Sequence, residues 1–210
     1  MGGRGSSSSR GGATGGLNPS DIVSTTSLIS APGKSAEINQ TLQVLKDISD
    51  EYGLTLSDVQ LATLKGGGLG VFGYYDSNGN LAINTSYFKS EAMTKAYDRS
   101  VEQGYHPPRG NKTGIEAVTA HEMGHALTEK AGGSWGKLDS TAGKIVKEAA
   151  KKAGYKDTAS FMAKISGYAK ENAAEAVAEA FADVYCNGNK ASKESRAVVN
   201  ALKKSLGGKK

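Results

Sequence analysis

One segment near the middle of the chain has both of its ends marked by helix-capping residues. Thr113 and Glu116 have the spacing of a capping box, and Gly132-Gly133 provides a stop. These signals predict a helix from about Gly114 to Ala131. Its middle reads His121-Glu122-Met123-Gly124-His125, and residues four positions apart lie on one face of a helix. Any fold of this chain must therefore accommodate two imidazoles that point the same way.

Two imidazoles at this spacing can converge on one metal ion. The pattern uses two of the three histidines in the chain. Zinc suits such ligands, and a catalytic zinc site needs a third protein ligand and one open position for water. Glu122 would lie beside the zinc-bound water without binding the metal, where it can act as general base. The motif therefore predicts a zinc site formed by His121 and His125, with Glu122 as the catalytic carboxylate.

Two places in the chain offer a third ligand. His106 lies in a Pro-Pro loop upstream, where a surface or hydrogen-bonded role explains it better than ligation. Downstream, Glu175, Glu179 and Asp183 repeat every four residues on one face of an alanine-rich helix. Three like charges on a largely apolar face repel one another unless a cation faces them. We therefore expect the third ligand on this downstream helix, with a solvated acidic face as the alternative.

The downstream segment also resembles a known family. The run SGYAKENAAEAVAEAF, residues 166 to 181, is similar to the second motif of the catalytic domain of anthrax lethal factor and its relatives. These are zincin-like peptidases of the gluzincin type, with a glutamate ligand on a later helix. The resemblance implies that Glu175 is the third zinc ligand, that Tyr168 is an active-site residue that stabilises the oxyanion together with zinc, and that Glu179 supports a ligand histidine.

Hydrophobic periodicity and turn signals predict an α+β fold with segregated helices. The resemblance makes this a zincin-like domain, with a small mixed sheet that includes a hairpin, an active-site helix, and a C-terminal helical subdomain carrying the glutamate ligand. Asn78-Gly79 marks the hairpin turn. Leu81–Thr85 is expected to be the edge strand that lines the cleft and binds peptide substrates by backbone hydrogen bonds. The predicted strands are Val59–Thr63, Leu69–Tyr75 and Leu81–Thr85. The other predicted helices are Ser35–Gly53, Ser86–Gln103, Asp139–Ala153, Thr158–Ile165, Glu171–Tyr185 and Ser192–Leu206.

Composition divides the chain into three regions. Residues 1–30 form a Gly/Ser-rich tail with few apolar side chains, and we expect them to be disordered. Residues 31–189 are the expected catalytic domain. Residues 190–210 form a basic helix and tail, with seven basic residues against Glu194 in a chain of net charge +5. A solvated helical face explains these charges better than a nucleic-acid interface does.

The N-terminus has no apolar run after its basic start, so we expect no Sec-dependent export, and no stretch is apolar enough for a membrane helix. The single cysteine, Cys186, excludes an internal disulfide and is expected to be a small buried residue rather than a nucleophile. A soluble protein, cytoplasmic or phage-associated, is therefore expected. The opening Met1–Ser6 is similar to the start of small phage or mobile-element proteins.

Two functions remain open from the sequence. The first is a zinc-dependent endopeptidase that hydrolyses peptide bonds in a protein or peptide substrate. The alternative is a catalytically inactive structural or interaction protein of a phage or mobile element, which retains the fold and binds nucleic acid or a partner through its basic C-terminus. The presence of every expected catalytic residue favours the enzyme.

Overall fold

The computed structural model describes residues 23–26, 28, 31, 33–64 and 71–207. Most of the tail predicted to be disordered, and part of the predicted strand Leu69–Tyr75, lie outside these ranges. Within the predicted tail, however, Val23–Thr26 forms strand β1, and the Leu28 side chain is fully buried. The boundary predicted at residue 31 is therefore too late, because the sheet already includes this short strand.

The four strands form one mixed sheet in the order β1-β2-β4-β3. Strand β2 (Leu56–Ala62) pairs in parallel with both β1 and β4 (Asn80–Asn84), and β3 (Gly73–Tyr75) pairs antiparallel with β4. The predicted turn joins β3 to β4, and Gly79 has the positive φ of 78° that the turn requires. The small mixed sheet with a hairpin is thus confirmed.

The prediction for the edge strand was wrong. Strand β4 lies inside the sheet between β2 and β3, and Leu81, Ala82 and Ile83 are each fully buried. A continuous apolar run is what a strand covered on both faces requires. Among the described strands the edges are β1 and β3, so β3 is the edge strand that faces the candidate metal centre described below.

Helix α2 (Ser35–Tyr52) covers the sheet and buries the predicted face, with Ile38, Leu42, Leu45 and Ile48 in the core. The predicted helix Ser86–Gln103 is instead divided. A 3₁₀ turn spans Thr85–Tyr87, because the Asn84 side chain accepts a hydrogen bond from the Ser86 N–H, and helix α3 (Ser90–Glu102) begins only after the buried Phe88.

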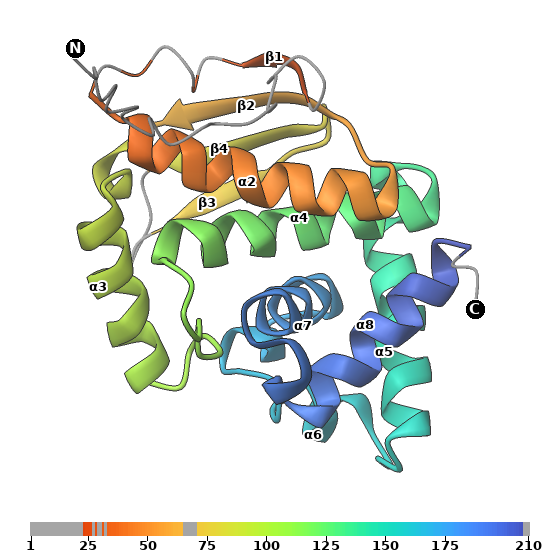
Figure 1. The fold of residues 1–210 in the computed structure, drawn as a ribbon. Helices are drawn as coiled ribbons and strands as arrows, with labels where there is room; N and C mark the ends of the chain where they lie inside the picture. Colours follow the sequence, from red (N-terminus) through yellow and green to blue (C-terminus); the bar gives the residue numbers. More distant parts are fainter. Residues whose placement is uncertain (1–22, 27, 29–30, 32, 65–70, 208–210) are drawn as a thin grey trace, which may run out of the picture.

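Helix α4 (Gly114–Gly132) crosses the middle of the molecule (Figure 1). The sheet and α2 lie on one side of it, and the C-terminal helices lie on the other. Its capping box between Thr113 and Glu116 is formed as predicted, and it is buried on nearly every face of its middle turns. A helix apolar on all sides is typical of a core element. The segment His121–His125 therefore lies on a helix that is enclosed on nearly all sides.

The C-terminal helices pack against α4 and against one another. Helix α7 makes the main contact with α4, while α5 and α8 pack on α7. Short 3₁₀ turns at Trp135–Lys137, Tyr168–Lys170 and Gly188–Lys190 connect them. The helices are α5 (Leu138–Lys152), α6 (Thr158–Met162), α7 (Ala173–Asn187) and α8 (Lys193–Ser205).

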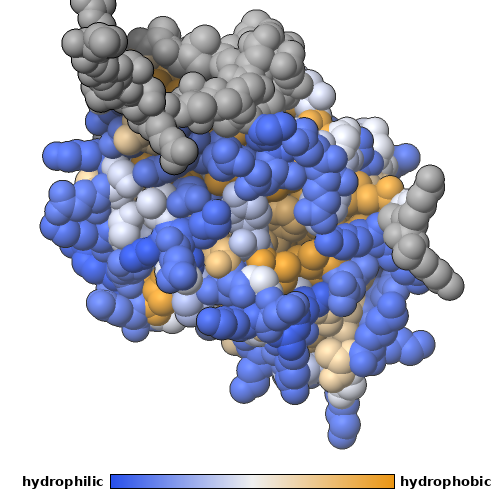
Figure 2. All heavy atoms as spheres, in the orientation of Figure 1, coloured by the Kyte–Doolittle hydropathy of each residue, from blue (hydrophilic) through white to orange (hydrophobic). Residues whose placement is uncertain are grey.

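Helix α8 is part of this helical layer, although the sequence suggested a separate basic region. It buries Val198, Val199 and Leu202. On its surface, Lys203 Nζ lies 2.8 Å from Glu51 Oε1, and Lys204 Nζ lies 2.9 Å from Glu148 Oε1. The face seen in Figure 2 is mostly hydrophilic, with hydrophobic residues showing in its middle and toward one edge. Within the described residues, no helix has the length and apolar character needed to cross a membrane.

Candidate metal centre

The three predicted ligands come together in the structure. His121 and His125 project from α4 toward Glu175 on α7, and the ligand atoms of all three lie within 4.8 Å of one another. Glu175 Oε2 is 3.2 Å from His121 Nε2 and 3.5 Å from His125 Nε2. This group can hold a metal ion. Two imidazole nitrogens and one carboxylate oxygen form a common set for catalytic zinc.

Glycine at position 124 allows the two helices to approach closely enough for this contact. A Cβ added to Gly124 would lie 2.7 Å from Ala178 Cα on α7, closer than real side chains pack. At the start of α7, the Asn172 side chain accepts a hydrogen bond from the Glu175 N–H and so fixes the first turn. The close helix contact and this cap together direct Glu175 at the two histidines.

The carboxylate of Glu175 fits a bound cation. Its Oε2 atom is buried, and within the described residues no hydrogen bond of good geometry reaches it, although two imidazoles lie beside it. Burial acts to raise the pKa of Glu175, but the contacts and charges of His121 and His125 outweigh it and hold the pKa well below its ordinary value. A buried carboxylate oxygen without a donor is costly unless a cation is bound to it.

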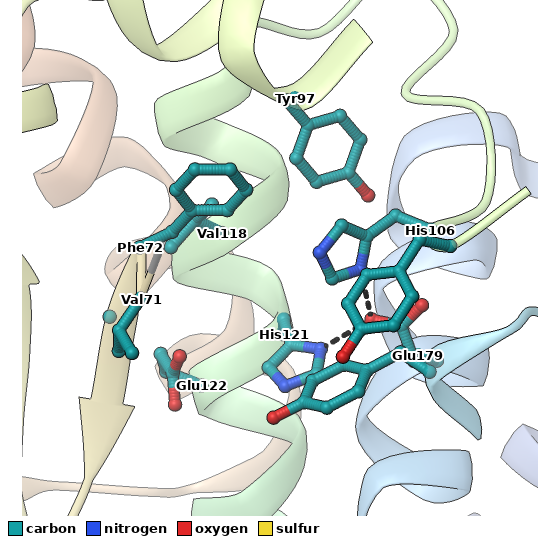
Figure 3. A pocket seen from close by; sticks show the side chains of 11 residues that line it. Val71, Phe72, Tyr97, His106, Val118, His121, Glu122 and Glu179 are labelled. Carbon is teal, nitrogen blue, oxygen red and sulfur yellow. Dashed lines mark hydrogen bonds and ion pairs between the residues drawn. The ribbon is translucent and has the colours of Figure 1, made fainter. Parts of the chain in front are cut away.

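His121 is fixed from its other side by Glu179. The Nδ1–H of His121 donates to Glu179 Oε1 at 2.8 Å, as the resemblance implied (Figure 3). Glu179 is fully buried. Burial by itself would raise the pKa of Glu179, but the charge and hydrogen bond of His106 and the hydrogen bond of His121 outweigh it and lower the pKa to about 2. A carboxylate of this kind fixes the tautomer and the orientation of a ligand histidine.

The acidic residues on α7 do not act as one group. Glu175 faces the two histidines, whereas Glu179 lies behind His121. Asp183 is turned away from the centre and accepts hydrogen bonds from the Asn187 side chain and from the Ser192 N–H. The repulsion between these three carboxylates is therefore not relieved by one cation that faces all of them. Glu179 and Asp183 instead accept hydrogen bonds from separate donors, and Glu175 faces the two histidines.

Glu122 is 5% exposed and lies beside the metal-binding group, opposite strand β3. A Cβ added to Gly73 would lie only 3.0 Å from Glu122 Oε1, so glycine at this position leaves room for the carboxylate. Burial raises the pKa of Glu122, and the positive charges of His121 and His125 lower it in part, so that the net pKa lies above its ordinary value. A raised pKa makes this carboxylate a better proton acceptor.

Tyr168 also lies at the centre. Its ring stacks on His121 with a centroid separation of 5.9 Å and on Tyr105 with one of 5.0 Å. Two backbone hydrogen bonds, from Gly167 N–H to Gly104 O and from Tyr168 N–H to Tyr105 O, hold its turn against the loop before α4. Burial, followed by the charge of Glu175, raises the pKa of Tyr168, so its hydroxyl keeps its proton and remains a donor.

A cleft runs along this centre and consists of two adjoining pockets. Five residues line both of them, including Gly73, His121, Glu122 and Tyr168. One pocket extends beneath Phe72, Tyr97 and His106, and the other opens toward Tyr75, Trp135 and Glu175. His121 and Glu122 therefore lie where the two pockets meet, whereas His125 and Glu175 line the second pocket.

Strand β3 presents its backbone along this cleft. Asn84 N–H donates to Phe72 O, and Asp76 N–H donates to Asn80 O, so Phe72, Tyr74 and Asp76 turn their backbone groups toward β4. Alternate residues of an antiparallel strand point the opposite way. Gly73 therefore directs its N–H and C=O toward the outer side of β3, where no described strand pairs with it.

His106 and Cys186 were also considered from the sequence, and the structure places them differently with respect to the metal-binding group. His106 is not in the metal-binding group, as expected, but its Nδ1 lies 2.9 Å from Glu179 Oε1. Sequence reasoning missed this contact, because 73 residues separate the two side chains and no spacing rule connects them. Cys186 is a free thiol outside the centre and is half-buried rather than fully buried as expected. Burial raises its pKa to about 12, which fits an unreactive thiol.

Comparison with family models, with curated proteins and with solved structures finds no match for this chain.

Proposed function

We propose that this protein is a zinc-dependent endopeptidase similar to the catalytic domain of anthrax lethal factor, with a zincin-like fold. The observation that carries the proposal is the convergence of His121 Nε2 and His125 Nε2 on a buried oxygen of Glu175, in a cleft that also holds Glu122. The residue types, their order along the chain and their placement all fit a zinc hydrolase.

His121, His125 and Glu175 would hold the zinc ion. When bound, zinc polarises the substrate carbonyl and makes a water molecule more acidic. Glu122 accepts the proton of the attacking water and passes it to the leaving amine, a role that its raised pKa supports. Tyr168 keeps its phenolic proton and donates a hydrogen bond to the oxyanion that forms at the scissile carbonyl.

An extended peptide is the substrate that best fits the cleft. The outward backbone groups of Gly73 can pair with a peptide strand laid along β3, as sheet edges commonly do. The cleft continues on both sides of Glu122, which supports cleavage within a chain rather than removal of a terminal residue. We therefore propose protein or peptide substrates cut internally.

The alternative, an inactive phage or mobile-element protein that binds nucleic acid through its basic C-terminus, has less support. Lys203 and Lys204 contact acidic residues of α2 and α5. Arg196 donates to the backbone oxygen of Asn189. These contacts agree with a solvated surface of the domain itself. Binding to DNA or RNA at low salt that disappears when these three residues are replaced with Gln would favour the alternative.

Cleavage can be tested without a known substrate. The zinc-loaded protein is incubated with a peptide library of all side-chain classes, and new termini are identified by mass spectrometry. We expect internal cleavage that stops when a chelator removes the metal and returns when zinc is restored. Cleavage that persists in the chelator, or the absence of any zinc-dependent product across the library, would contradict the proposed activity.

A further inference from the structure

His106 and His121 share one carboxylate oxygen. His106 Nδ1 lies 2.9 Å from Glu179 Oε1, and His121 Nδ1 lies 2.8 Å from the same atom (Figure 3). Because a carboxylate oxygen only accepts, both Nδ1 atoms carry the hydrogens of these bonds. In the neutral form of His121 the other ring nitrogen, Nε2, therefore carries the lone pair, and this atom faces Glu175, which is the orientation that a metal ligand needs.

The second oxygen of Glu179 is also occupied. Ser166 Oγ donates to Glu179 Oε2 at 2.8 Å, and the same Oγ accepts the Ala169 N–H at 3.0 Å. The carboxylate is thus held by donors from α4, from the loop before α4, and from the turn before α7. Of the two donors other than His121, only His106 binds the oxygen that His121 uses.

His106 itself is held rigidly. Its ring stacks on Tyr97 with a centroid separation of 5.2 Å and an interplanar angle of 9°, and its side chain is only 11% exposed. The two backbone hydrogen bonds between the Gly104–Tyr105 segment and the Gly167–Tyr168 turn fix the loop that carries it. A side chain anchored in this way can determine where the Glu179 carboxylate lies.

We propose that His106 is a positioning residue of the metal centre, an inference that rests on the proposed zinc site. It donates from Nδ1 to Glu179 Oε1 and so fixes the carboxylate that orients His121. His106 is not a fourth ligand, because its ring nitrogens do not belong to the group in which His121, His125 and Glu175 converge, and its ring centroid is 6.4 Å from that of His121. Its effect on the metal is transmitted through Glu179.

Three substitutions separate hydrogen bonding from simple packing. His106→Asn places an amide donor near the position of Nδ1 but removes the ring that stacks on Tyr97. His106→Phe keeps a ring for the stack but has no donor. His106→Gln carries a donor nearer to the position of Nε2, on the wrong side for Glu179. The zinc dissociation constant of each variant is measured by chelator competition, beside the wild type, and melting curves in EDTA report folding.

We expect His106→Phe and His106→Gln to bind zinc roughly 10- to 100-fold more weakly than the wild type, the range found when the support of a ligand is removed. His106→Asn should remain closer to the wild type than either. If packing alone mattered, Phe would bind better than Asn. Tighter zinc binding by His106→Phe than by His106→Asn, or equal affinities of the two, would overturn the inference. If the Phe variant does not fold, the comparison of His106→Asn with His106→Gln decides the question in the same way. A wild-type protein without zinc would instead overturn the proposed function and this inference together.

Discussion

At the residue scale, the environment of Glu122 suits a proton acceptor. The carboxylate is almost fully buried, which raises its pKa. The positive charges of His121 and His125 lower the pKa in part. Gly73 on the facing strand leaves room for it. A carboxylate with a raised pKa is a better proton acceptor, which suits a general base.

The substitution Glu122→Gln should lower kcat/KM for a library-derived peptide by about 10²- to 10⁴-fold, the usual contribution of a general base. Zinc should stay bound, because Glu122 is not among the three converging ligands. Glu91→Gln is the matched control, since Glu91 is 70% exposed on α3 and pairs with Lys95. Unchanged cleavage by the Glu122 variant would show that another group takes the proton.

Cys186 provides a separate test at this scale. Burial raises the pKa of its thiol to about 12, so almost no thiolate is present at pH 8. Because the thiolate is the reactive form, the folded protein should react with a disulfide reagent such as DTNB much more slowly than free cysteine does. Reaction should become rapid in denaturant. A fast reaction of the folded protein would mean that the thiol is accessible and activated.

The residues of the candidate site were predictable to different degrees. His121, Glu122 and His125 follow from spacing within one capped helix, and Glu175 and Tyr168 follow from the resemblance of one contiguous segment. His106 could not be found in this way. Its contact with Glu179 joins a loop and a helix that are adjacent only in the fold.

At the scale of elements, the metal-binding group depends on the close contact between α4 and α7. Gly124 faces Ala178 so closely that an added Cβ would lie 2.7 Å from its Cα and 3.3 Å from Phe181 Cβ. These are backbone and near-backbone atoms, which cannot move aside independently. Any side chain at position 124 must therefore push the two helices apart, and with them His125 and Glu175.

The substitution Gly124→Ala should therefore destabilise the protein by about 1–3 kcal/mol, as overpacked cores do. It should also weaken zinc binding. Gly143→Ala in α5 is the matched control, because its added Cβ meets nothing within 4 Å. That control should gain up to about 1 kcal/mol from better helix propensity. Chemical denaturation and chelator competition measure both effects, and equal behaviour of the two variants would contradict this account of the helix contact.

The elements themselves were largely readable from local signals. The capping box before α4 appears in the structure where it was predicted, and α8 begins and ends within one residue of the predicted helix Ser192–Leu206. The pairing of strands was not readable, because β4 is placed inside the sheet by its parallel contact with β2, which lies about 20 residues earlier in the chain. The break at Phe88 was not readable either, because nothing local in the sequence shows that this ring is buried in the core.

At the scale of the whole molecule, the metal-binding group connects two halves of the fold. His121 and His125 belong to the central helix, whereas Glu175 belongs to the helical layer beyond it (Figure 1). A bound ion joins these layers in the folded protein only, so zinc binding should add to the free energy of unfolding.

Zinc at about 100 times its dissociation constant should stabilise the fold by about 2.7 kcal/mol. For a chain of this size that corresponds to a Tm increase of roughly 5–11 °C, at about 2–4 °C per kcal/mol. Differential scanning calorimetry with zinc and with EDTA measures it. Glu171→Ala, at an exposed position before α7, should keep the response, and Glu175→Ala should lose it. An unchanged response in Glu175→Ala would place the ion elsewhere.

The most direct test of the central claim is the metal content of the purified protein beside Glu175→Ala, measured by elemental mass spectrometry after zinc loading and dialysis. The account predicts about one zinc ion per wild-type chain, as in a single three-ligand site, and little or none in the variant. A wild-type protein that retains no zinc, or a variant that retains as much as the wild type, would contradict it.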